Sequence, residues 1–318
     1  MSAALRKPAR LEPGDTVALV APASGFDNAQ FDAGVEELRA LGFMPRWDDS
    51  IFARGMYSAG DAQRRAQAFE SAWAAPESAA VIGVRGGYGS VQMLPHLNTA
   101  TFAEHATAFV GYSDLTSLLT YLVCQQGVVA FHGPTVAGRL GRGADGYDRD
   151  SFLRALTQSQ PLGELGGDGV EVVARGEARG RLLGGTLSML AAAAGTPFAL
   201  TPWDDTILLL EDVGERPYRL DRLVQQLRLS GAFARVRGIV LGTFPRCDEP
   251  GGAVTARDAL ADLFADFSGP VVFGFPTGHV EGPALTVPLG VSARLVADGA
   301  GRLVIEEAAV TDPQVHRR

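Results

Sequence analysis

The first half of the chain alternates short apolar runs with longer segments in which apolar residues recur every three or four positions. The apolar runs predict buried strands, and the longer segments predict amphipathic helices. The predicted strands cover residues 16–21, 79–84, 108–111 and 128–132. The predicted helices cover residues 28–41, 60–74, 91–97 and 115–125. Apolar strands separated by helices favour an α/β fold with a doubly wound parallel sheet.

The second half of the chain has a different pattern, with short strands and helices in no regular alternation. Its predicted strands include "DTILLLEDVGE", "VRGIVLGTF", "PVVFGF", "LTVPLG", "VSARLVA" and "GRLVIEEA". Between the halves lies a Gly-, Asp-, Gln- and Arg-rich stretch with one amphipathic piece at 151–156. We therefore expect an N-terminal α/β domain at 1–145, a linker at 146–168 and a mixed α+β domain at 169–318.

The segment "FVGYSDLTSLLTYL" places a serine where a strand turns into a helix. In one interpretation, Ser113 or Asp114 caps the helix by accepting a hydrogen bond from a first-turn amide. In the other, the turn is a nucleophile elbow that exposes the Ser113 hydroxyl and aims the Asp114 amide at an oxyanion. The second glycine of the G-x-S-x-G pattern is missing, so this segment alone leaves both interpretations open.

The loop "VRGGYGS" at 84–90 also follows a predicted strand and precedes a predicted helix. It matches neither GxGxxG nor GxxxxGK[ST], and no acidic residue follows at the distance that dinucleotide binding requires. Its glycines serve either a tight turn or an oxyanion hole, to which the amide of Gly86 or Gly87 would contribute beside Ser113.

A serine nucleophile needs a base and a carboxylate that orients it. Of the five histidines, His132 and His279 follow apolar strands, where loops hold side chains at a sheet edge. Glu211 and Asp212 end the very apolar strand in "LLLEDVGE". Either an acid there is desolvated as part of a functional site, or the strand simply ends in polar residues that face solvent. The residues alone do not choose between His132 and His279 as the base, or between Glu211 and Asp212 as the carboxylate.

Composition narrows the classes of function. The chain has 318 residues, 46% of them hydrophobic, and a net charge of -8 with no basic run, which disfavours nucleic acid and favours a small diffusible substrate. The two cysteines, Cys124 and Cys247, form no disulfide framework and suit a reducing cytoplasm. No apolar run is long enough to span a membrane. No HExxH or similar spacing predicts a metal site, and we expect no cofactor.

Seven segments, in order along nearly the whole chain, resemble the serine LD-carboxypeptidase family, which includes muramoyl-tetrapeptide carboxypeptidases and microcin C immunity peptidases. They are "LEPGDTVALVAPAS", "VRGGYGS", "VGYSDLTSL", "FHGP", "LLGGTLSML", "LLLEDVGERPYRLDRLVQQL" and "FGFPTGHVEGPALTVPLG". The resemblance implies that Ser113 is the nucleophile, Glu211 the triad carboxylate and His279 the base. It implies an oxyanion hole made by the Asp114 amide and the amide of Gly86 or Gly87.

The resemblance also implies an activity and an architecture. The activity is hydrolysis of the bond between the L-centre of a diamino acid and a terminal D-alanine in cytoplasmic murein peptides. The alternative is cleavage of a peptidyl-nucleotide antibiotic, which the absence of a long insertion in the second half disfavours. The family fold implies a C-terminal swivelling domain, a homodimer and a triad that spans a cleft between the domains. A substrate carboxylate requires a partner, for which Arg85, Arg181 and Arg216 are open candidates.

Overall fold

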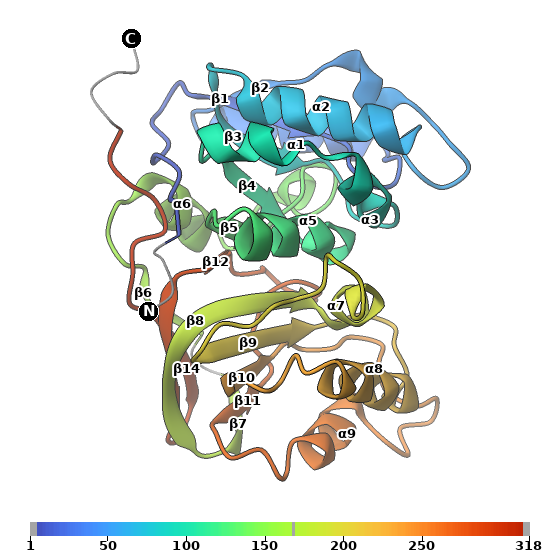
Figure 1. The fold of residues 1–318 in the computed structure, drawn as a ribbon, viewed down its shortest axis with the longest axis vertical. Coiled ribbons are helices and arrows are strands. Elements are labelled where there is room, and N and C mark those ends of the chain that lie inside the picture. The colour runs from blue at the N-terminus through green and yellow to red at the C-terminus, as the bar shows by residue number, and fades with distance from the viewer. Residues whose placement is uncertain (1–4, 167–168, 314–318) are drawn as a thin grey trace.

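The computed structural model describes residues 5–166 and 169–313, and it contains two sheets, one above the other in Figure 1. The first sheet has the order β12-β5-β4-β3-β1-β2 and is parallel except for β12. Its strands are β1 (Thr16–Val20), β2 (Met44–Arg46), β3 (Ser78–Gly83), β4 (Ala108–Gly111), β5 (Ala130–His132) and β12 (Val287–Leu289). The carboxyl ends of β1, β3 and β4 meet at one edge, which is where ligands bind on such sheets.

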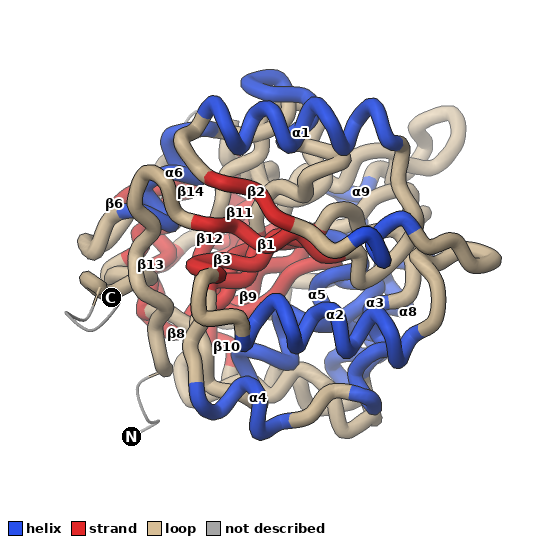
Figure 2. Tube along the Cα trace, turned by 90° about the horizontal axis from the view of Figure 1, so that it is seen from above, coloured by secondary structure: helices blue, strands red, loops and turns tan. Residues whose placement is uncertain are grey.

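Helices cover both faces of the first sheet, as expected for a doubly wound fold. They are α1 (Asn28–Ala40), α2 (Ala62–Ala74), α3 (Ser90–Met93), α4 (Thr99–Glu104) and α5 (Thr116–Thr120). Figure 2 shows α1 on one side of the strands and α2 to α4 on the other. α1 forms because Asp27 caps its first turn and because Phe31, Val35 and Leu38 share one buried face.

The second sheet is mixed and has the order β6-β14-β13-β8-β9-β10-β11-β7. Its strands are β6 (Gly163–Gly166), β7 (Glu171–Ala174), β8 (Gly176–Thr186), β9 (Thr206–Glu211), β10 (Val236–Leu241), β11 (Val271–Phe273), β13 (Ser292–Ala297) and β14 (Gly301–Ile305). The remaining helices are α6 (Arg149–Thr157), α7 (Leu187–Ala193), α8 (Pro217–Leu229) and α9 (Ala256–Leu263). The α/β fold class with a second mixed unit is therefore confirmed.

Several local expectations require correction. The strand in "LTVPLG" becomes β12 and pairs with β5 in the first sheet, although it comes late in the sequence. The expected linker holds α6 and β6. The helix expected at 115–125 divides into a 3-10 turn, α5 and a π-helical turn at Tyr121–Gln125. β2 and α4 were not predicted, because a three-residue edge strand and a six-residue helix are too short to show periodicity.

The two sheets share one hydrophobic core. Buried apolar residues from both halves of the chain form a single cluster, and α5 contacts both α7 and β8. Side chains from the two sheets can therefore be held at fixed distances from one another. No helix within residues 5–166 and 169–313 combines the length and the apolar character that crossing a membrane requires.

Candidate active site

Ser113 stands in a left-handed turn directly after β4, with a φ of 64° that is rare for a residue other than glycine. Leu115 anchors this turn by filling the space beside two glycines. A Cβ at Gly83 or Gly111 would lie 2.2 or 2.6 Å from Leu115 Cδ1. The turn directs the Ser113 hydroxyl toward the second sheet, where it lies 3.1 Å from Nε2 of His279.

The helix-cap interpretation of the turn is wrong. Neither the 3-10 turn at Ser113–Leu115 nor α5 has a side-chain cap. The buried Asp114 carboxylate instead accepts hydrogen bonds from the amides of Gly89, at 3.3 Å, and Ser90, at 2.8 Å. Asp114 therefore ties the glycine loop 84–90 to the serine turn, a role that no sequence pattern indicated.

His279 lies in the loop after β11, and Glu211 orients its ring. The Nδ1 atom of His279 is 2.7 Å from Glu211 Oε2, and the His279 amide donates to the same oxygen at 2.8 Å. Glycine is required at position 278, which has a φ of 64°, because a Cβ added there would lie 2.4 Å from the carboxyl carbon of Glu211. Thr243 holds the loop by donating to the His279 carbonyl at 3.0 Å. With Nδ1–H donated to Glu211, Nε2 is free to accept a proton from Ser113.

Glu211 ends β9 and is completely buried, with 0% of its surface exposed. Its Oε1 atom accepts a hydrogen bond from the Thr186 hydroxyl. Burial by itself raises the pKa of Glu211, but the charge and hydrogen bonds of His279, with His132 close by, outweigh burial and hold the pKa well below its ordinary value. Burial in turn lowers the pKa of His279, but the Glu211 carboxylate outweighs this and raises that pKa above its ordinary value.

His132, the second candidate base, lies on the far side of the Glu211 carboxylate. It is completely buried, its Nδ1 atom is 3.2 Å from the Thr277 hydroxyl oxygen, and its Nε2 atom is 3.6 Å from Glu211 Oε1. The structure thus brings His279 to Ser113 and places His132 behind Glu211.

Asp212, the second candidate carboxylate, binds backbone amides and not the imidazole of His279. Its oxygens accept hydrogen bonds from the amides of Ser188, at 2.7 Å, and Val213, at 2.8 Å, and no bond joins it to His279. Burial first, and then the charge of Glu211, raise the pKa of Asp212 to about 6. Of the two acids that close β9, only Glu211 contacts the imidazole among the described residues.

The glycine loop approaches Ser113 at Gly86. A Cβ on Gly86 would lie 2.9 Å from Ser113 Cβ and 3.4 Å from the Asp114 amide nitrogen, whereas a Cβ on Gly87 would meet Ser24. Among the described residues, the amides of Gly86, Gly87 and Asp114 donate no hydrogen bond to a protein acceptor. Unpaired amides beside a serine hydroxyl are suited to binding an oxyanion, and Gly86 is the nearer glycine.

None of the three arginines that were candidates for a substrate carboxylate lines the cavity beside His279. Arg85 donates to the Gly25 carbonyl, Arg181 donates to the Gly290 carbonyl, and Arg216 pairs with Glu249. The cavity of about 380 Å³ beside His279 is lined by other cationic side chains, among them Arg139, Arg142 and Arg246. No sequence pattern marked these arginines, because Arg139 and Arg142 belong to the 3-10 helix at Leu140–Asp145 and its cap, Arg246 belongs to the loop after β10, and the two segments meet only in the folded chain.

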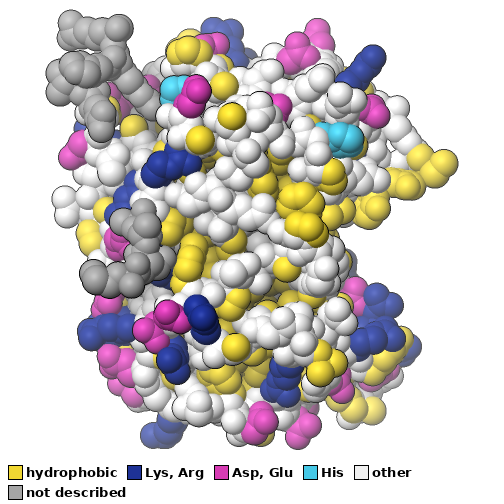
Figure 3. Space-filling view, viewed as in Figure 1, with side chains coloured by type: hydrophobic (Ala, Val, Ile, Leu, Met, Phe, Trp, Pro, Cys, Tyr) yellow, Lys and Arg dark blue, Asp and Glu magenta, His cyan; other side chains and the backbone are white. Residues whose placement is uncertain are grey.

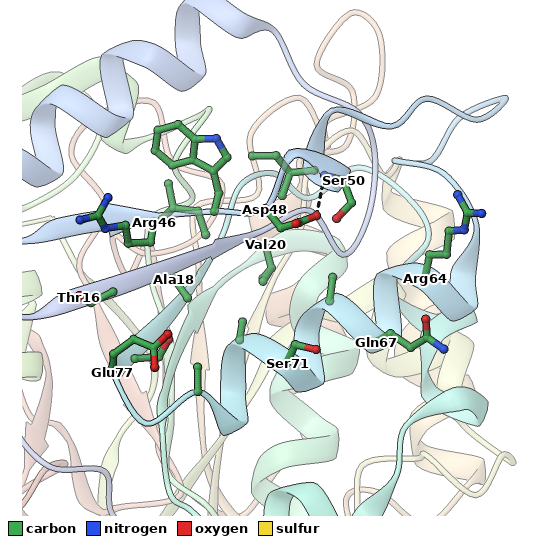
Figure 4. A pocket seen from close by; sticks show the side chains of 17 residues that line it. Thr16, Ala18, Val20, Arg46, Asp48, Ser50, Arg64, Gln67, Ser71 and Glu77 are labelled. Carbon is green, nitrogen blue, oxygen red and sulfur yellow. Dashed lines mark hydrogen bonds between the residues drawn. The ribbon is translucent and has the colours of Figure 1, made fainter.

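A further cavity, of about 550 Å³, lies on the first sheet between β1, the end of β2 and α2. Figure 4 shows Thr16 and Val20 on one side of it and Gln67 and Ser71 on the other. None of the predicted site residues lines this cavity. The space-filling view shows a separate hollow between the two halves of the molecule, on the right below a projecting loop (Figure 3). The loop is at the position of residues 53–60, which include the exposed Met56 and Tyr57.

The assembled groups form a chain from a serine hydroxyl through an imidazole to a buried carboxylate. Such a chain can move a proton from the hydroxyl to Nε2 while the carboxylate stabilises the resulting imidazolium. Within the described residues, no group of three or more His, Cys, Asp or Glu side chains could hold a metal ion.

Two family models match the chain. Residues 17–133 match the LD-carboxypeptidase N-terminal domain, and residues 179–295 match the LD-carboxypeptidase C-terminal domain. The first range contains Ser113, and the second contains Glu211 and His279.

Similar proteins extend over nearly the whole chain. A putative carboxypeptidase of Streptomyces coelicolor is 38% identical over 97% of this chain and 99% of its own length. The murein tetrapeptide carboxypeptidase of Pseudomonas aeruginosa is 32% identical over 83% of this chain and 87% of its own. A solved structure of the microcin C7 self-immunity protein with aspartyl sulfamoyl adenosine superposes with a TM-score of 0.87 at 24% identity, covering 96% of this chain and all of that one. At that identity, the last likeness shows the fold alone.

Proposed function

Because the chain belongs to the LD-carboxypeptidase family, whose N-terminal and C-terminal domains it contains, we propose that it hydrolyses the bond before a terminal D-alanine in murein tetrapeptides. The single observation that carries this proposal is the line of contacts from Ser113 Oγ to His279 Nε2 and from His279 Nδ1 to Glu211 Oε2, at 3.1 and 2.7 Å. Murein peptides are favoured as substrates because a relative that bears the name murein tetrapeptide carboxypeptidase is 32% identical.

In the proposed first step, Ser113 Oγ attacks the carbonyl carbon of the diamino acid while His279 Nε2 takes the hydroxyl proton. The carbonyl oxygen becomes an oxyanion near the amides of Asp114 and Gly86, which stabilise its charge. His279 then gives its proton to the nitrogen of D-alanine, the carbon–nitrogen bond breaks, and the rest of the peptide stays esterified to Ser113.

In the second step, His279 takes a proton from a water molecule, whose oxygen attacks the ester carbon. The proton returns to Ser113 Oγ as the shortened peptide leaves. Glu211 keeps Nδ1 protonated throughout and stabilises the imidazolium that forms in each half of the reaction.

The test is mass spectrometry of the full-length protein with the murein tetrapeptide that ends in a diamino acid followed by D-alanine. We expect loss of one alanine from the peptide and release of free D-alanine, neither of which occurs with Ser113→Ala. A parallel sample would contain a peptidyl-nucleotide of the microcin C kind. Turnover of that compound without turnover of the tetrapeptide would contradict the proposal and favour the immunity-type activity.

A cytoplasmic location and a homodimer stay predictions. The location is checked by fractionation of the source cells and the dimer by analytical ultracentrifugation of the purified chain.

A further inference from the structure

The cavity beside His279 is strongly cationic for a chain of net charge -8. It lies between the two halves of the molecule, because its lining includes Tyr112 and Arg139 from the first half and Arg246 from the second. Its lining includes these charged or catalytic side chains: Arg139, Arg142, Arg246, Glu281 and His279. Three arginines thus face one glutamate in a space of about 380 Å³.

The three arginines differ in how far the protein already uses them. Arg139 is 5% exposed and donates to the carbonyls of Gly146, Val280 and Gly282 at 2.6 to 3.1 Å, so its donors serve the fold. Arg142 is exposed and reaches only backbone carbonyls, those of Asp145 at 3.0 Å and Glu281 at 3.4 Å.

Arg246 is exposed and, among the described residues, makes no hydrogen bond and no salt bridge. It has a φ of 58°, and Phe244, two residues before it, has a φ of 50°. Left-handed backbone at non-glycine residues costs free energy and is found mainly where function requires it. Two strained positions within three residues, which bring an arginine without a hydrogen-bond partner beside His279, therefore indicate a binding role.

The proposed reaction decides which part of the substrate reaches this cavity. The oxyanion lies near Gly86 and Asp114, whereas His279 must protonate the leaving nitrogen and therefore faces the D-alanine. In D-alanine, only the α-carbon separates that nitrogen from the carboxylate. A carboxylate held there needs a cationic partner with unused donors, which Arg142 and Arg246 both have.

From this geometry, and resting on the proposed function, we propose that Arg142 and Arg246 bind the free carboxylate of the terminal residue. They thereby restrict cleavage to the end of a peptide. Arg139 is a positioning residue that holds the loop around His279 and packs over Tyr112, with 5.6 Å between the guanidinium carbon and the ring centroid.

The experiment compares two substrates that differ only at this carboxylate: the tetrapeptide and its C-terminal amide. We expect Arg142→Gln and Arg246→Gln each to lower kcat/KM for the free acid roughly tenfold, and the double variant roughly a hundredfold, chiefly by raising KM. For the amide, wild type and variants should agree within about threefold, since the lost contact is absent from the start. The control is Arg216→Gln, whose guanidinium pairs with Glu249 and does not line the cavity.

A fluorophosphonate without a carboxylate reports the state of the triad in the same proteins. Equal labelling rates in wild type and in both arginine variants are expected, because Ser113, His279 and Glu211 are untouched. Equal losses for acid and amide substrates would overturn the inference and assign the arginines to another part of the peptide. Unchanged kcat/KM for the free acid in the double variant would overturn it as well.

These outcomes differ from failure of the proposed function. That failure would be a wild type that reacts with the fluorophosphonate but releases no D-alanine, and it would remove the basis of the present inference too. Failure of the inference alone would be a wild type that releases D-alanine and does not depend on Arg142 or Arg246.

Discussion

The first sheet and the second sheet hold their parts of the site by different means. The first positions Ser113 through backbone geometry: a left-handed turn, glycines that admit Leu115, and unpaired amides. The second positions Glu211 and His279 through side-chain hydrogen bonds around a carboxylate with no exposed surface. A nucleophile must be accessible, whereas a buried carboxylate must have its hydrogen bonds satisfied.

This difference predicts that changes at the serine cost mainly rate, whereas changes at the carboxylate cost both rate and stability.

Ser113→Ala should lower kcat by on the order of 10⁶-fold, because the nucleophile itself is lost. The free energy of unfolding should change by less than about 1 kcal/mol, since among the described residues the Ser113 hydroxyl forms a hydrogen bond only with His279. Steady-state kinetics and urea unfolding measure the two quantities. Activity retained with a native circular dichroism spectrum would mean that the turn carries no nucleophile.

Glu211→Gln should lower kcat by on the order of 10⁴-fold, because an amide cannot stabilise the imidazolium and favours the wrong tautomer. Unlike the serine change, it should also lower the free energy of unfolding by about 1–3 kcal/mol. The cause is that the amide NH₂ accepts no hydrogen bond, so either the Thr186 hydroxyl must rotate and lose its acceptor or the His279 amide is left facing a donor.

The matched control for Glu211→Gln is Asp212→Asn, which changes the neighbouring acid, bound only to backbone amides. We expect Asp212→Asn to retain far more activity. The opposite ranking would assign the orienting role to Asp212.

Gly86→Ala and Gly87→Ala separate the two candidate oxyanion donors. The Cβ of Gly86→Ala would lie 2.9 Å from Ser113 Cβ, so we expect a rate loss of about 10²- to 10³-fold, as for a lost oxyanion donor. The Cβ of Gly87→Ala would meet Ser24 at a φ of 100°, which should destabilise the loop by about 1–2 kcal/mol with a smaller loss of rate. A larger rate loss in Gly87→Ala would make Gly87 the donor. Single-turnover kinetics and thermal unfolding measure both effects.

The smallest effect concerns pH. Because the pKa of His279 is raised above its ordinary value of 6.5, kcat/KM should rise with pH through a pKa above 6.5 as the base becomes neutral. A raised folded-state pKa contributes stability that is present below the unfolded pKa and lost as pH rises through the folded pKa. Activity should therefore rise over the range in which this contribution to stability falls.

Comparing pH profiles tests the origin of that raised pKa. In Glu211→Gln, the acid limb of kcat/KM should move to lower pH, because the carboxylate that raises the His279 pKa is gone. An unmoved limb would mean that a group other than His279 titrates.

The local pattern of apolar and polar residues predicted the longer helices and strands well and the shorter ones poorly. β1, β3, β4, β9, α1 and α2 lie close to their expected positions, because apolar runs and helical periodicity are strong over their lengths. β2 has only three residues, one of them proline, and produces no comparable signal. The place of β12 in the first sheet could not be predicted, since pairing with β5 joins residues far apart in the chain.

The sequence by itself determined the alternation of elements in the first half, the glycines that permit the serine turn, and a short set of candidate nucleophiles, bases and acids. Residue chemistry alone left His132 and His279, and likewise Glu211 and Asp212, as alternatives, and the family resemblance favoured His279 and Glu211. Only the tertiary structure showed that His279 contacts both Ser113 and Glu211, placed Gly86 against Ser113, and gathered Arg142 and Arg246 beside His279. The reason is physical: Ser113 and His279 are 166 positions apart, and Glu211 and His279 are 68 apart. Hydrogen bonds at such separations depend on how the sheets pack, which no local pattern encodes.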